Sequence, residues 1–470
     1  MAMSVNLDTL WSQVEAQKER IPSLYGKVDF SITPERFTDN PAVESMLPGK
    51  LARQYRQRIL ADSARIERAR AYTLLGDTVA DAYAALTPTY GFRPLVQMLQ
   101  KACDQGVESI PDAPQELKDF IAAMERTPTW LDMNLVEKGA RYGRIQMANL
   151  VPFAIRGAFI ATFMNKYSGL PMALTGALST QASVQRVNET ASFFTTATLP
   201  GALRRDGVGF KAAAMVRLMH SMVRFHLMKD PEKWDCKVYG IPIPQVDQMP
   251  AGTIPAFLTA FTVISKGRTT FNDRERAVVE LCRYQCYLLG LPEDLLPATP
   301  REIVDVMLTY ASTLRDGYDD ATCGELVRAT MAAYRPKDHS LKSRIYNACE
   351  KSFATVFFQK AFLSENEKPV AKMMGVEASW WDYLLFVLVQ CYVIPRLIVH
   401  RIAMNIPLVN DLADRFLINK INRLLVDYGH PEFTTNPDQY RTRTKPEKSR
   451  NTRSTKNNRH NTNGRAGAAT

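Results

Sequence analysis

Histidine is scarce in this 470-residue chain, and no copy belongs to a familiar catalytic or metal-binding motif. None has glutamate three residues before it, so the Glu-x-x-His motif of di-iron helical bundles is missing. The chain also lacks His-Glu-x-x-His, a Walker phosphate loop and a Gly-x-Gly-x-x-Gly turn. Cys-x-x-Cys-His is absent, which excludes covalent attachment of haem. Few chemistries remain for the six histidines, which are His220, His226, His339, His400, His430 and His460.

Cysteine is sparse as well: seven copies are scattered along the chain in no metal-ligand spacing. Cys282 and Cys286 lie one helical turn apart, which predicts two small buried side chains rather than a redox pair. The N-terminus has no apolar core of an export signal. We therefore expect a reducing, cytoplasmic setting, with membrane association as an option and without secretion.

Positive charge is concentrated at the C-terminal end. From Arg441 onward, nine Lys or Arg stand against Glu447 alone, so this tail holds +8 of the formal +11. The tail also lacks large apolar residues, which predicts disorder for residues 431–470. A solubilising role is one interpretation, and weak attraction to anionic lipid or nucleic acid is the other. Because the rest of the chain is nearly neutral, we expect no specific nucleic-acid partner.

The apolar residues recur with helical spacing nearly everywhere, and no sustained period-2 alternation occurs. The pattern predicts an all-α protein, a multi-helix bundle over residues 49–430 that follows an irregular N-terminal arm, residues 1–48. The predicted helical stretches are 49–85, 114–126, 133–148, 151–165, 179–198, 208–228, 251–265, 273–289, 300–315, 321–334 and 339–364.

One apolar segment, residues 383–409, permits two interpretations. Its purest part, Tyr383 to Ile394, ends before Pro395 and is shorter than the roughly 20 residues that a spanning helix needs. We expect a buried C-terminal core helix here. The alternative is a peripheral membrane contact, because Trp380 and Trp381 just before the segment are residues typical of membrane interfaces.

The helix predicted over 208–228 carries His220 at its centre, with Arg217 and Arg224 about one turn away on either side. At ~100° per residue, both arginines fall within about 60° of the histidine on one flank. A haem fits such a face, because the imidazole can bind iron and the arginines can bind propionates. The alternative is a core histidine whose arginines snorkel or pair with acids on another helix. The opposite flank is apolar and comprises Val216, Val223 and Leu227.

A second polar cluster lies about thirty residues upstream, in an otherwise apolar helix. Arg186, Glu189 and Thr190 stand at positions i, i+3 and i+4 and therefore share one face. An ordinary intrahelical ion pair is one interpretation. If the cluster is buried, its desolvation cost favours a functional site instead.

These two clusters, taken in order, resemble the family of rubber oxygenases (latex-clearing proteins) and MpaB-type oxygenases. The pattern Arg-x-x-(Lys/Glu)-Thr precedes the histidine of "VRLMHSMVR", and "LLGLPEDLLPATPREIVDVM" matches the family in character. The similarity extends over about residues 140 to 330. The intervening run "WDCKVYGIPIPQVDQMPAGT" supplies the family pattern at Trp234, Asp235, Gly240, Pro242, Ile243, Gln245, Asp247 and Thr253.

The resemblance implies a globin-like helical core that holds a non-covalent b-type haem, with His220 as the axial ligand of the iron. It also places Arg186, Glu189 and Thr190 in the distal pocket, as the catalytic side chains. Rubber-cleaving members carry a distal lysine that can bind iron, and this chain has Glu189 at that position. A carboxylate there implies a general base or a hydrogen-bonding partner instead. Gln245 and Asp247 are candidates for orienting the His220 ring, or for stabilising a turn.

The functional hypothesis is a haem-dependent oxygenase that uses O2 on an apolar small molecule or lipid, isoprenoid or terpenoid in character. It would cleave or oxygenate a carbon–carbon double bond, with Arg217 and Arg224 binding the cofactor. The alternative is a non-catalytic helical protein that binds haem or lipid or docks on a membrane. A peroxidase-like or gas-sensing use of the same haem is a third hypothesis.

Overall fold

The computed structural model describes residues 6–47, 49–175, 180–363 and 367–429, and most of these residues are helical. In chain order, the α-helices and the short 3-10 and π segments (η) are α1 (Leu7–Arg20), α2 (Pro22–Tyr25), α3 (Gly49–Leu51), η1 (Ala52–Arg56), α4 (Gln57–Leu60), α5 (Ser63–Thr73), α6 (Thr78–Ala84), α7 (Thr87–Tyr90), α8 (Phe92–Gln105), η2 (Val107–Ser109), α9 (Gln115–Glu125), α10 (Met133–Asn149), α11 (Val151–Ala161), α12 (Lys166–Leu174), α13 (Thr180–Thr196), α14 (Val208–Met228), α15 (Cys236–Tyr239), α16 (Gln245–Ser265), α17 (Asp273–Leu288), η3 (Glu293–Leu295), α18 (Pro300–Thr313), η4 (Asp320–Gly324), α19 (Glu325–Ala332), α20 (Leu341–Phe362), α21 (Glu367–Met373), α22 (Trp380–Ala403) and α23 (Asn410–Tyr428).

The predicted all-α class is confirmed. Over the described ranges the backbone forms no β-strand, and two isolated bridges join Phe37 to Leu314 and Ser45 to Arg315. The stretch predicted as one helix over 49–85 is broken, because Asp62 and Asp77 cap the N-termini of new helices, α5 and α6.

The first part of the N-terminal arm is helical, so the expectation of an irregular arm is wrong there. Residues 7–20 form α1, whose Leu10 and Val14 are buried in the main core. The side chain of Gln17 fixes the helix, since its Nε2 donates to the Leu74 carbonyl at 3.0 Å and its Oε1 accepts from Gly76 N–H at 2.8 Å. The arm therefore belongs to the same packed unit as the helices that follow it.

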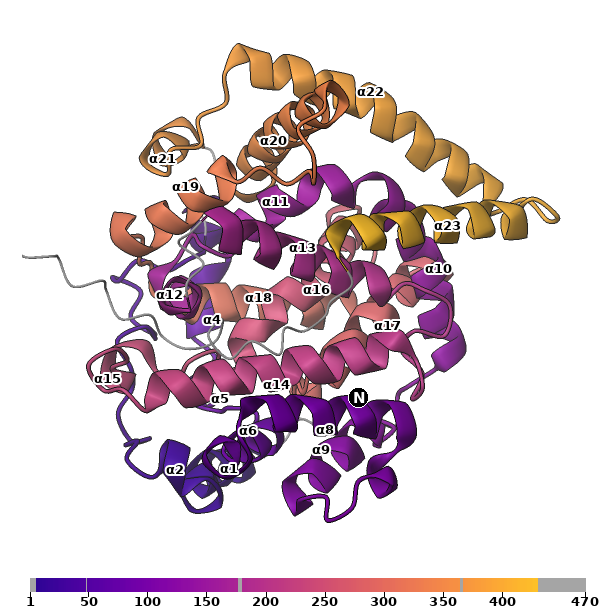
Figure 1. The fold of residues 1–470 in the computed structure, drawn as a ribbon. Helices are drawn as coiled ribbons and strands as arrows, with labels where there is room; N and C mark the ends of the chain where they lie inside the picture. Colours follow the sequence, from indigo (N-terminus) through magenta and orange to yellow (C-terminus); the bar gives the residue numbers. More distant parts are fainter. Residues whose placement is uncertain (1–5, 48, 176–179, 364–366, 430–470) are drawn as a thin grey trace, which may run out of the picture.

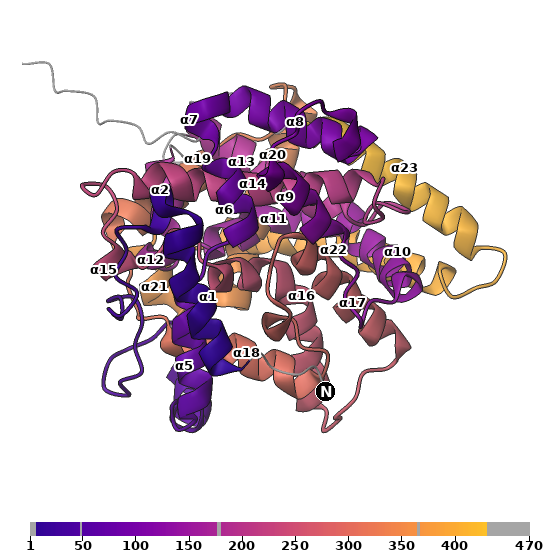
Figure 2. The ribbon, with the colours of Figure 1, turned by 90° about the horizontal axis from the view of Figure 1, so that it is seen from below.

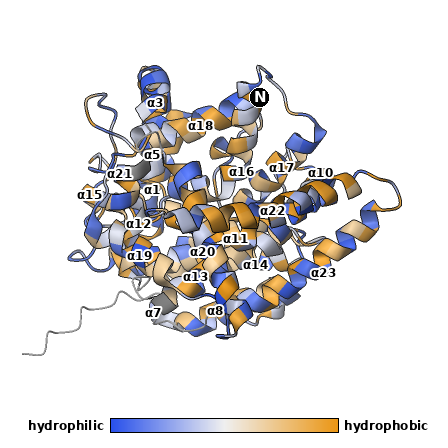
Figure 3. Ribbon diagram, turned by 90° about the horizontal axis from the view of Figure 1, so that it is seen from above, coloured by the Kyte–Doolittle hydropathy of each residue, from blue (hydrophilic) through white to orange (hydrophobic). Residues whose placement is uncertain are grey.

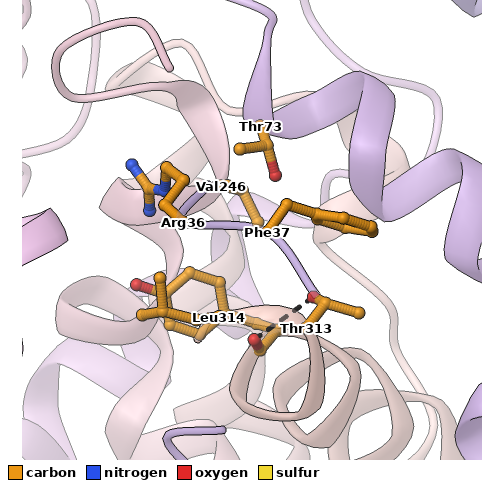
Figure 4. Close-up of a pocket in the computed structure, with 7 residues that line it drawn as sticks. Arg36, Phe37, Thr73, Val246, Thr313 and Leu314 are labelled. Carbon is orange, nitrogen blue, oxygen red and sulfur yellow. Dashed lines mark hydrogen bonds between the residues drawn. The ribbon is translucent and has the colours of Figure 1, made fainter. Parts of the chain in front are cut away.

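The later part of the arm reaches the end of α18, where it encloses a very small cavity (Figure 4). Its volume is about 10 Å³, room for about one water molecule and no substrate. Beside it, Arg36 donates to Asp247 at 2.9 Å, and the Tyr310 hydroxyl donates to the same carboxylate at 3.2 Å. This buried network anchors the arm to the first turn of α16.

Helix α14 crosses the middle of the molecule (Figure 1). Seen from below, α6, α8 and α9 cover one side of it (Figure 2), and α13 and α17 contact it as well. Most of its side chains are buried, including Phe210, Leu218 and Phe225. The predicted bounds, 208–228, are confirmed.

Two pairs of helices approach each other closely at glycines. A Cβ at Gly139 of α10 would lie 2.1 Å from the carbonyl oxygen of Ala277 in α17. A Cβ at Gly157 of α11 would lie 2.6 Å from the carbonyl oxygen of Ala354 in α20. Only glycine permits these backbone distances, so both helix pairs are tightly packed.

The expectation that α22 is a buried core helix is wrong. Three of its residues, Phe386, Val389 and Val393, are buried, and most of its other apolar side chains are exposed. Of the helices in the described part of the chain, it alone is long and apolar enough to cross a membrane by length and composition.

The predicted disordered tail, residues 431–470, lies outside the described residues. All seven cysteines are free thiols, and both Cys282 and Cys286 are buried, as the sequence predicts.

Candidate functional site

His220 lies at the centre of α14 and remains partly exposed, although most of the side chains around it on that helix are buried. Helix α14 begins after Gly207, and an alanine run, residues 212–214, favours helix before the histidine. Val216, one turn earlier, is likewise partly exposed, while Met219 and Val223 are buried. The imidazole therefore stands on an apolar surface in the interior.

The imidazole ring is held by a relay of two glutamines from α16. Nδ1 of His220 lies 2.9 Å from Oε1 of Gln248, and Nε2 of Gln248 donates to Oε1 of Gln245 at 3.0 Å. Because the Gln248 amide nitrogen is already donating, its oxygen faces the histidine, and Nδ1 carries the proton. Within the described part of the chain, Nε2 of His220 has no hydrogen-bond partner, so its lone pair is free.

The environment keeps this ring neutral. Burial lowers the pKa of His220 to about 4, and the cations Arg224 and Arg186 also lower it, against the opposing effects of Gln248 and Asp77. A neutral imidazole with a proton on Nδ1 and a free Nε2 is the form that binds a metal.

Arg217 and Arg224 each pair with an aspartate of the α6 segment. Arg217 binds both carboxylate oxygens of Asp77, through Nε and through Nη2, the latter at 2.8 Å. Arg224 contacts Asp81 at 2.9 Å and also donates to the Pro242 carbonyl at 3.0 Å. Burial lowers the pKa of Arg224, but Asp81, Tyr25 and Asp77 together raise it above its ordinary value, so the guanidinium stays charged.

This arrangement matches the alternative that the sequence left open for the two arginines, pairing with acids on another helix. The role of Arg217 and Arg224 as partners of haem propionates stays a prediction. Arg224 and Asp81 are fully buried, and the hydroxyl of Tyr25 also binds Asp81, at 2.5 Å. A pair desolvated to this degree costs several kcal/mol if one partner is removed.

On α13, the polar cluster found in the sequence is intact and partly buried. Nη1 of Arg186 lies 3.6 Å from the Glu189 carboxylate, which also accepts from Nε2 of Gln185 at 2.9 Å. The hydroxyl of Thr190 donates to the Arg186 carbonyl at 2.9 Å. Burial raises the pKa of Glu189, against the opposing effects of Arg186 and Gln185.

Helices α13 and α14 are in contact, and Arg186 is near enough to His220 to lower its pKa. The structure thus brings the two clusters together across the interface of these helices. Whether Arg186, Glu189 and Thr190 act on a substrate stays a prediction.

The family model described as "ER-bound oxygenase mpaB/B'/Rubber oxygenase, catalytic domain" matches residues 145–382, which is half of the chain. The chain belongs to this family. The matched span contains α13, α14 and both glutamines of the relay, so His220 lies within the region that corresponds to the catalytic domain. Membership in this oxygenase family supports an oxygenase role.

Among solved structures, latex clearing protein LCP in the closed state has a similar fold, with a TM-score of 0.52 and 17% sequence identity. The similarity covers 75% of this chain and 91% of that chain. At this identity the likeness concerns the fold alone, and it agrees with the all-α architecture. Among curated proteins, no match is found.

In this member of the oxygenase family, the sequence does not identify two contacts of the site: that of Gln248 with His220 and that of Asp247 with Arg36. Gln248 holds the His220 ring, whereas Gln245 acts through it and Asp247 binds Arg36 instead. Gln245 and Asp247 lie on the first turn of α16, which begins before the predicted helical stretch 251–265. The spacing of Gln245 and Gln248 at i and i+3 was the available signal, because it places both amides on one helix face.

A larger cavity lies where the N-terminal helix meets the α6 segment. Its volume is about 350 Å³, and the residues that line it include Gln13, Gln17, Arg20, Asp77, Arg217 and Gln245. Gly290, which also lines this cavity, has a positive φ of 87°. A Cβ there would lie 2.6 Å from both Nε of Arg217 and Oδ2 of Asp77, so only glycine fits beside this ion pair.

Proposed function

We propose that this protein is a haem b-dependent oxygenase that acts with O2 on an apolar isoprenoid or terpenoid compound. The observation that carries the proposal is the state of His220: neutral, fixed through Nδ1 by Gln248, and free at Nε2. Family membership supports the oxygenase class, and the haem and the substrate are the proposed part.

The residues around His220 fit a haem. The ring has a tautomer that can bind iron through Nε2, and Val216 and Val223 provide an apolar surface beside it. His220, Arg186 and Glu189 are all partly exposed, and burial lowers the pKa of His220 and raises that of Glu189. We infer that they line accessible space inside the protein. No cluster of three metal-binding side chains occurs among the described residues, and a haem iron needs one such ligand.

When bound, haem would supply an iron centre for the activation of O2, and Nε2 of His220 would hold that iron. The relay from Gln245 through Gln248 keeps the proton on Nδ1 and orients the ring. Arg217 and Arg224 remain with their aspartates in this proposal, and propionate binding is not required of them.

Glu189 is the candidate for proton transfer. Since burial raises its pKa, its carboxyl group holds a proton more readily than an exposed glutamate does. Gln185 and Arg186 bind its two oxygens and fix the side chain on α13. The proposed product chemistry is cleavage or oxygenation of a carbon–carbon double bond in an apolar substrate.

A non-catalytic protein that binds haem or lipid is the second candidate. It is favoured by the contacts within α13, because Arg186, Glu189 and Thr190 satisfy one another as they would on an ordinary helix face. Loaded protein that shows the haem spectrum but forms no oxygenated product would support this candidate.

The first test is spectroscopic. Protein purified after expression with a haem supply is expected to show a Soret band, which His220→Ala should shift and weaken. His226→Ala is the matched control, since it removes a second imidazole from the same helix and should leave the band unchanged. Colourless wild-type protein would contradict the haem, and an unchanged band in His220→Ala would contradict the ligand.

The second test concerns the substrate. The loaded protein is incubated under 18O2 with a panel of polyisoprenoids and terpenoids, and the products are read by mass spectrometry. Incorporation of 18O that falls sharply in Glu189→Gln, with an unchanged Soret band, supports the role of Glu189. Peroxide-dependent turnover without 18O from O2 would point to a peroxidase instead.

A further inference from the structure

Helix α22 is well anchored along one edge. Ser379 caps its N-terminus in a capping box with Asp382, and Asp382 also accepts from the Ser352 hydroxyl of α20 at 2.7 Å. The ring of Phe386 stacks on that of Phe353 with centroids 4.8 Å apart. Helix α22 thus packs on α20, and it also contacts α10 and α23, whereas its remaining side faces away from the protein (Figure 1).

The side turned away from the protein is apolar over the full length of the helix (Figure 3). At ~100° per residue its side chains fall within about 60° of one line, whereas Asp382, Arg396 and Arg401 lie about 80° or more from that line. We call this set the outer face; its members are 42% to 65% exposed and comprise Trp380, Leu384, Val387, Leu388, Ile398 and Ile402.

The apolar surface continues around the turn into α23. Leu408 is 97% exposed and has a φ of 74°, a left-handed conformation that is costly for leucine. The exposed side chains of Leu412 and Phe416 follow on the first turns of α23. The α22–α23 turn projects from the body of the molecule (Figure 2). The outer face and these three residues together form what we call the docking surface.

Cations without acidic partners flank this surface. Arg396, Arg401, Arg415 and Arg423 are exposed, and no ion pair joins them to an acid in the described part of the chain. The acids on the first turns of α23 are already engaged: Asp411 binds Arg141 at 2.7 Å, and Asp414 binds Arg144.

We propose that the docking surface binds the interface of an anionic phospholipid bilayer, with α22 lying in the plane of the membrane. Three features favour lipid as the occupant. The apolar face extends over about 33 Å, from the 22 residue steps between Trp380 and Ile402 at ~1.5 Å each, with no polar group for a protein partner to recognise. The stacked Trp380 and Trp381, with ring centroids 3.8 Å apart, lie at one end, where aromatic residues anchor helices at interfaces. The flanking arginines match anionic headgroups.

A second copy of this chain fits the surface less well. Its own docking surface would bring the same four arginines, and the acids beside that surface, Asp411 and Asp414, are already engaged. A membrane-spanning α22 is also disfavoured, because the helix would have to detach from α20 and carry Arg396 and Arg401 into lipid. An amphipathic helix held at the interface requires neither detachment from α20 nor transfer of these arginines into lipid.

The test uses the full-length protein and sedimentation with vesicles of phosphatidylcholine alone or with about 30 mol% phosphatidylglycerol. The variant is Leu388→Ser/Ile398→Ser, and the matched control is Val208→Ser/Leu258→Ser, whose side chains are similarly exposed elsewhere, at 57% and 58%. We expect the wild type and the control to bind anionic vesicles. The outer-face variant should bind about tenfold more weakly. Because all three proteins keep the basic tail, equal binding by all three would overturn the proposal.

The exposed Cys391 offers a second measurement, since it is the cysteine on the outer side of α22. A polarity-sensitive fluorophore on this thiol should shift its emission to the blue on anionic vesicles, and Cys391→Ser provides the labelling control. An unshifted emission would contradict docking by this face. Sedimentation that shows a dimer of wild type, a monomer of Leu388→Ser/Ile398→Ser and no vesicle binding would assign the surface to a second copy.

Discussion

Helices α14 and α22 are both long, apolar and interrupted by basic residues, yet the fold uses them in opposite ways. Helix α14 is buried and keeps His220, Arg217 and Arg224 inside the protein. Helix α22 is mostly exposed, and its apolar residues face outward. Hydropathy alone does not distinguish the two.

The partners of the charged groups distinguish them. Arg217 and Arg224 of α14 each meet a carboxylate of the α6 segment, Lys211 meets Asp104 of α8, and the imidazole of His220 meets an amide. Along α22 the arginines point to the flanks without acids, and the apolar side chains have no protein cover. The arginines of α14 are paired inside the protein, whereas the arginines and the exposed apolar side chains of α22 lack such partners in the described part of the chain.

The largest expected effect comes from breaking a charge pair of α14. Asp81→Ala leaves the buried Arg224 and the Tyr25 hydroxyl without their acceptor, so the free energy of unfolding should fall by about 3–5 kcal/mol. Chemical denaturation measures this value. Asp382→Ala, which removes a cap from α22, is the control and should cost about 1 kcal/mol. A loss below that of the control would contradict the importance of the buried pair.

The next effect is the dependence of stability on pH in haem-free protein. The folded pKa of His220 is about 4, below the ordinary value, so the unfolded chain takes up the proton first as the pH falls. The contribution of His220 is complete above about pH 6.5 and is lost toward pH 4, with a loss of roughly 2 kcal/mol by pH 5. His220→Leu should flatten this part of the denaturation profile. An equal slope in both proteins would show that the ring is not buried in its neutral form.

A smaller effect is expected from the relay behind the ring. Gln248→Leu removes the acceptor for Nδ1–H and should lower haem affinity about tenfold to hundredfold in a spectroscopic titration. Gln248→Glu still accepts this proton and should retain binding. Asp247→Asn is the neighbouring control, because that carboxylate binds Arg36 and not the histidine. Equal affinity for Gln248→Leu and wild type would remove Gln248 from the site.

The smallest effect belongs to the turn after α22. Leu408→Asn should raise the free energy of unfolding by no more than about 1 kcal/mol, because asparagine tolerates a positive φ and the leucine packs on nothing. Thermal denaturation checks this value, and vesicle binding should weaken in the same variant. A clear loss of stability would mean that Leu408 is packed within the protein.

Local features of the site could be predicted from the sequence, and long-range ones could not. The bounds of α14 and the central place of His220 follow from helical periodicity, and the face shared by Arg186, Glu189 and Thr190 follows from their spacing. Asp77 and Asp81 lie about 140 residues before their arginines, so no local pattern connects them. Periodicity also leaves open which side of α22 the protein covers, since an apolar stripe serves a core and a membrane equally well.

Gly290 shows that a site can constrain a residue that has no functional side chain. Its missing side chain leaves room for the Arg217–Asp77 pair, and that pair stands beside the glutamine that orients the histidine relay. Alanine, the smallest replacement, would meet both charged groups and a backbone that disfavours it. In a library of random variants, position 290 should therefore tolerate as little change as the charged residues it adjoins.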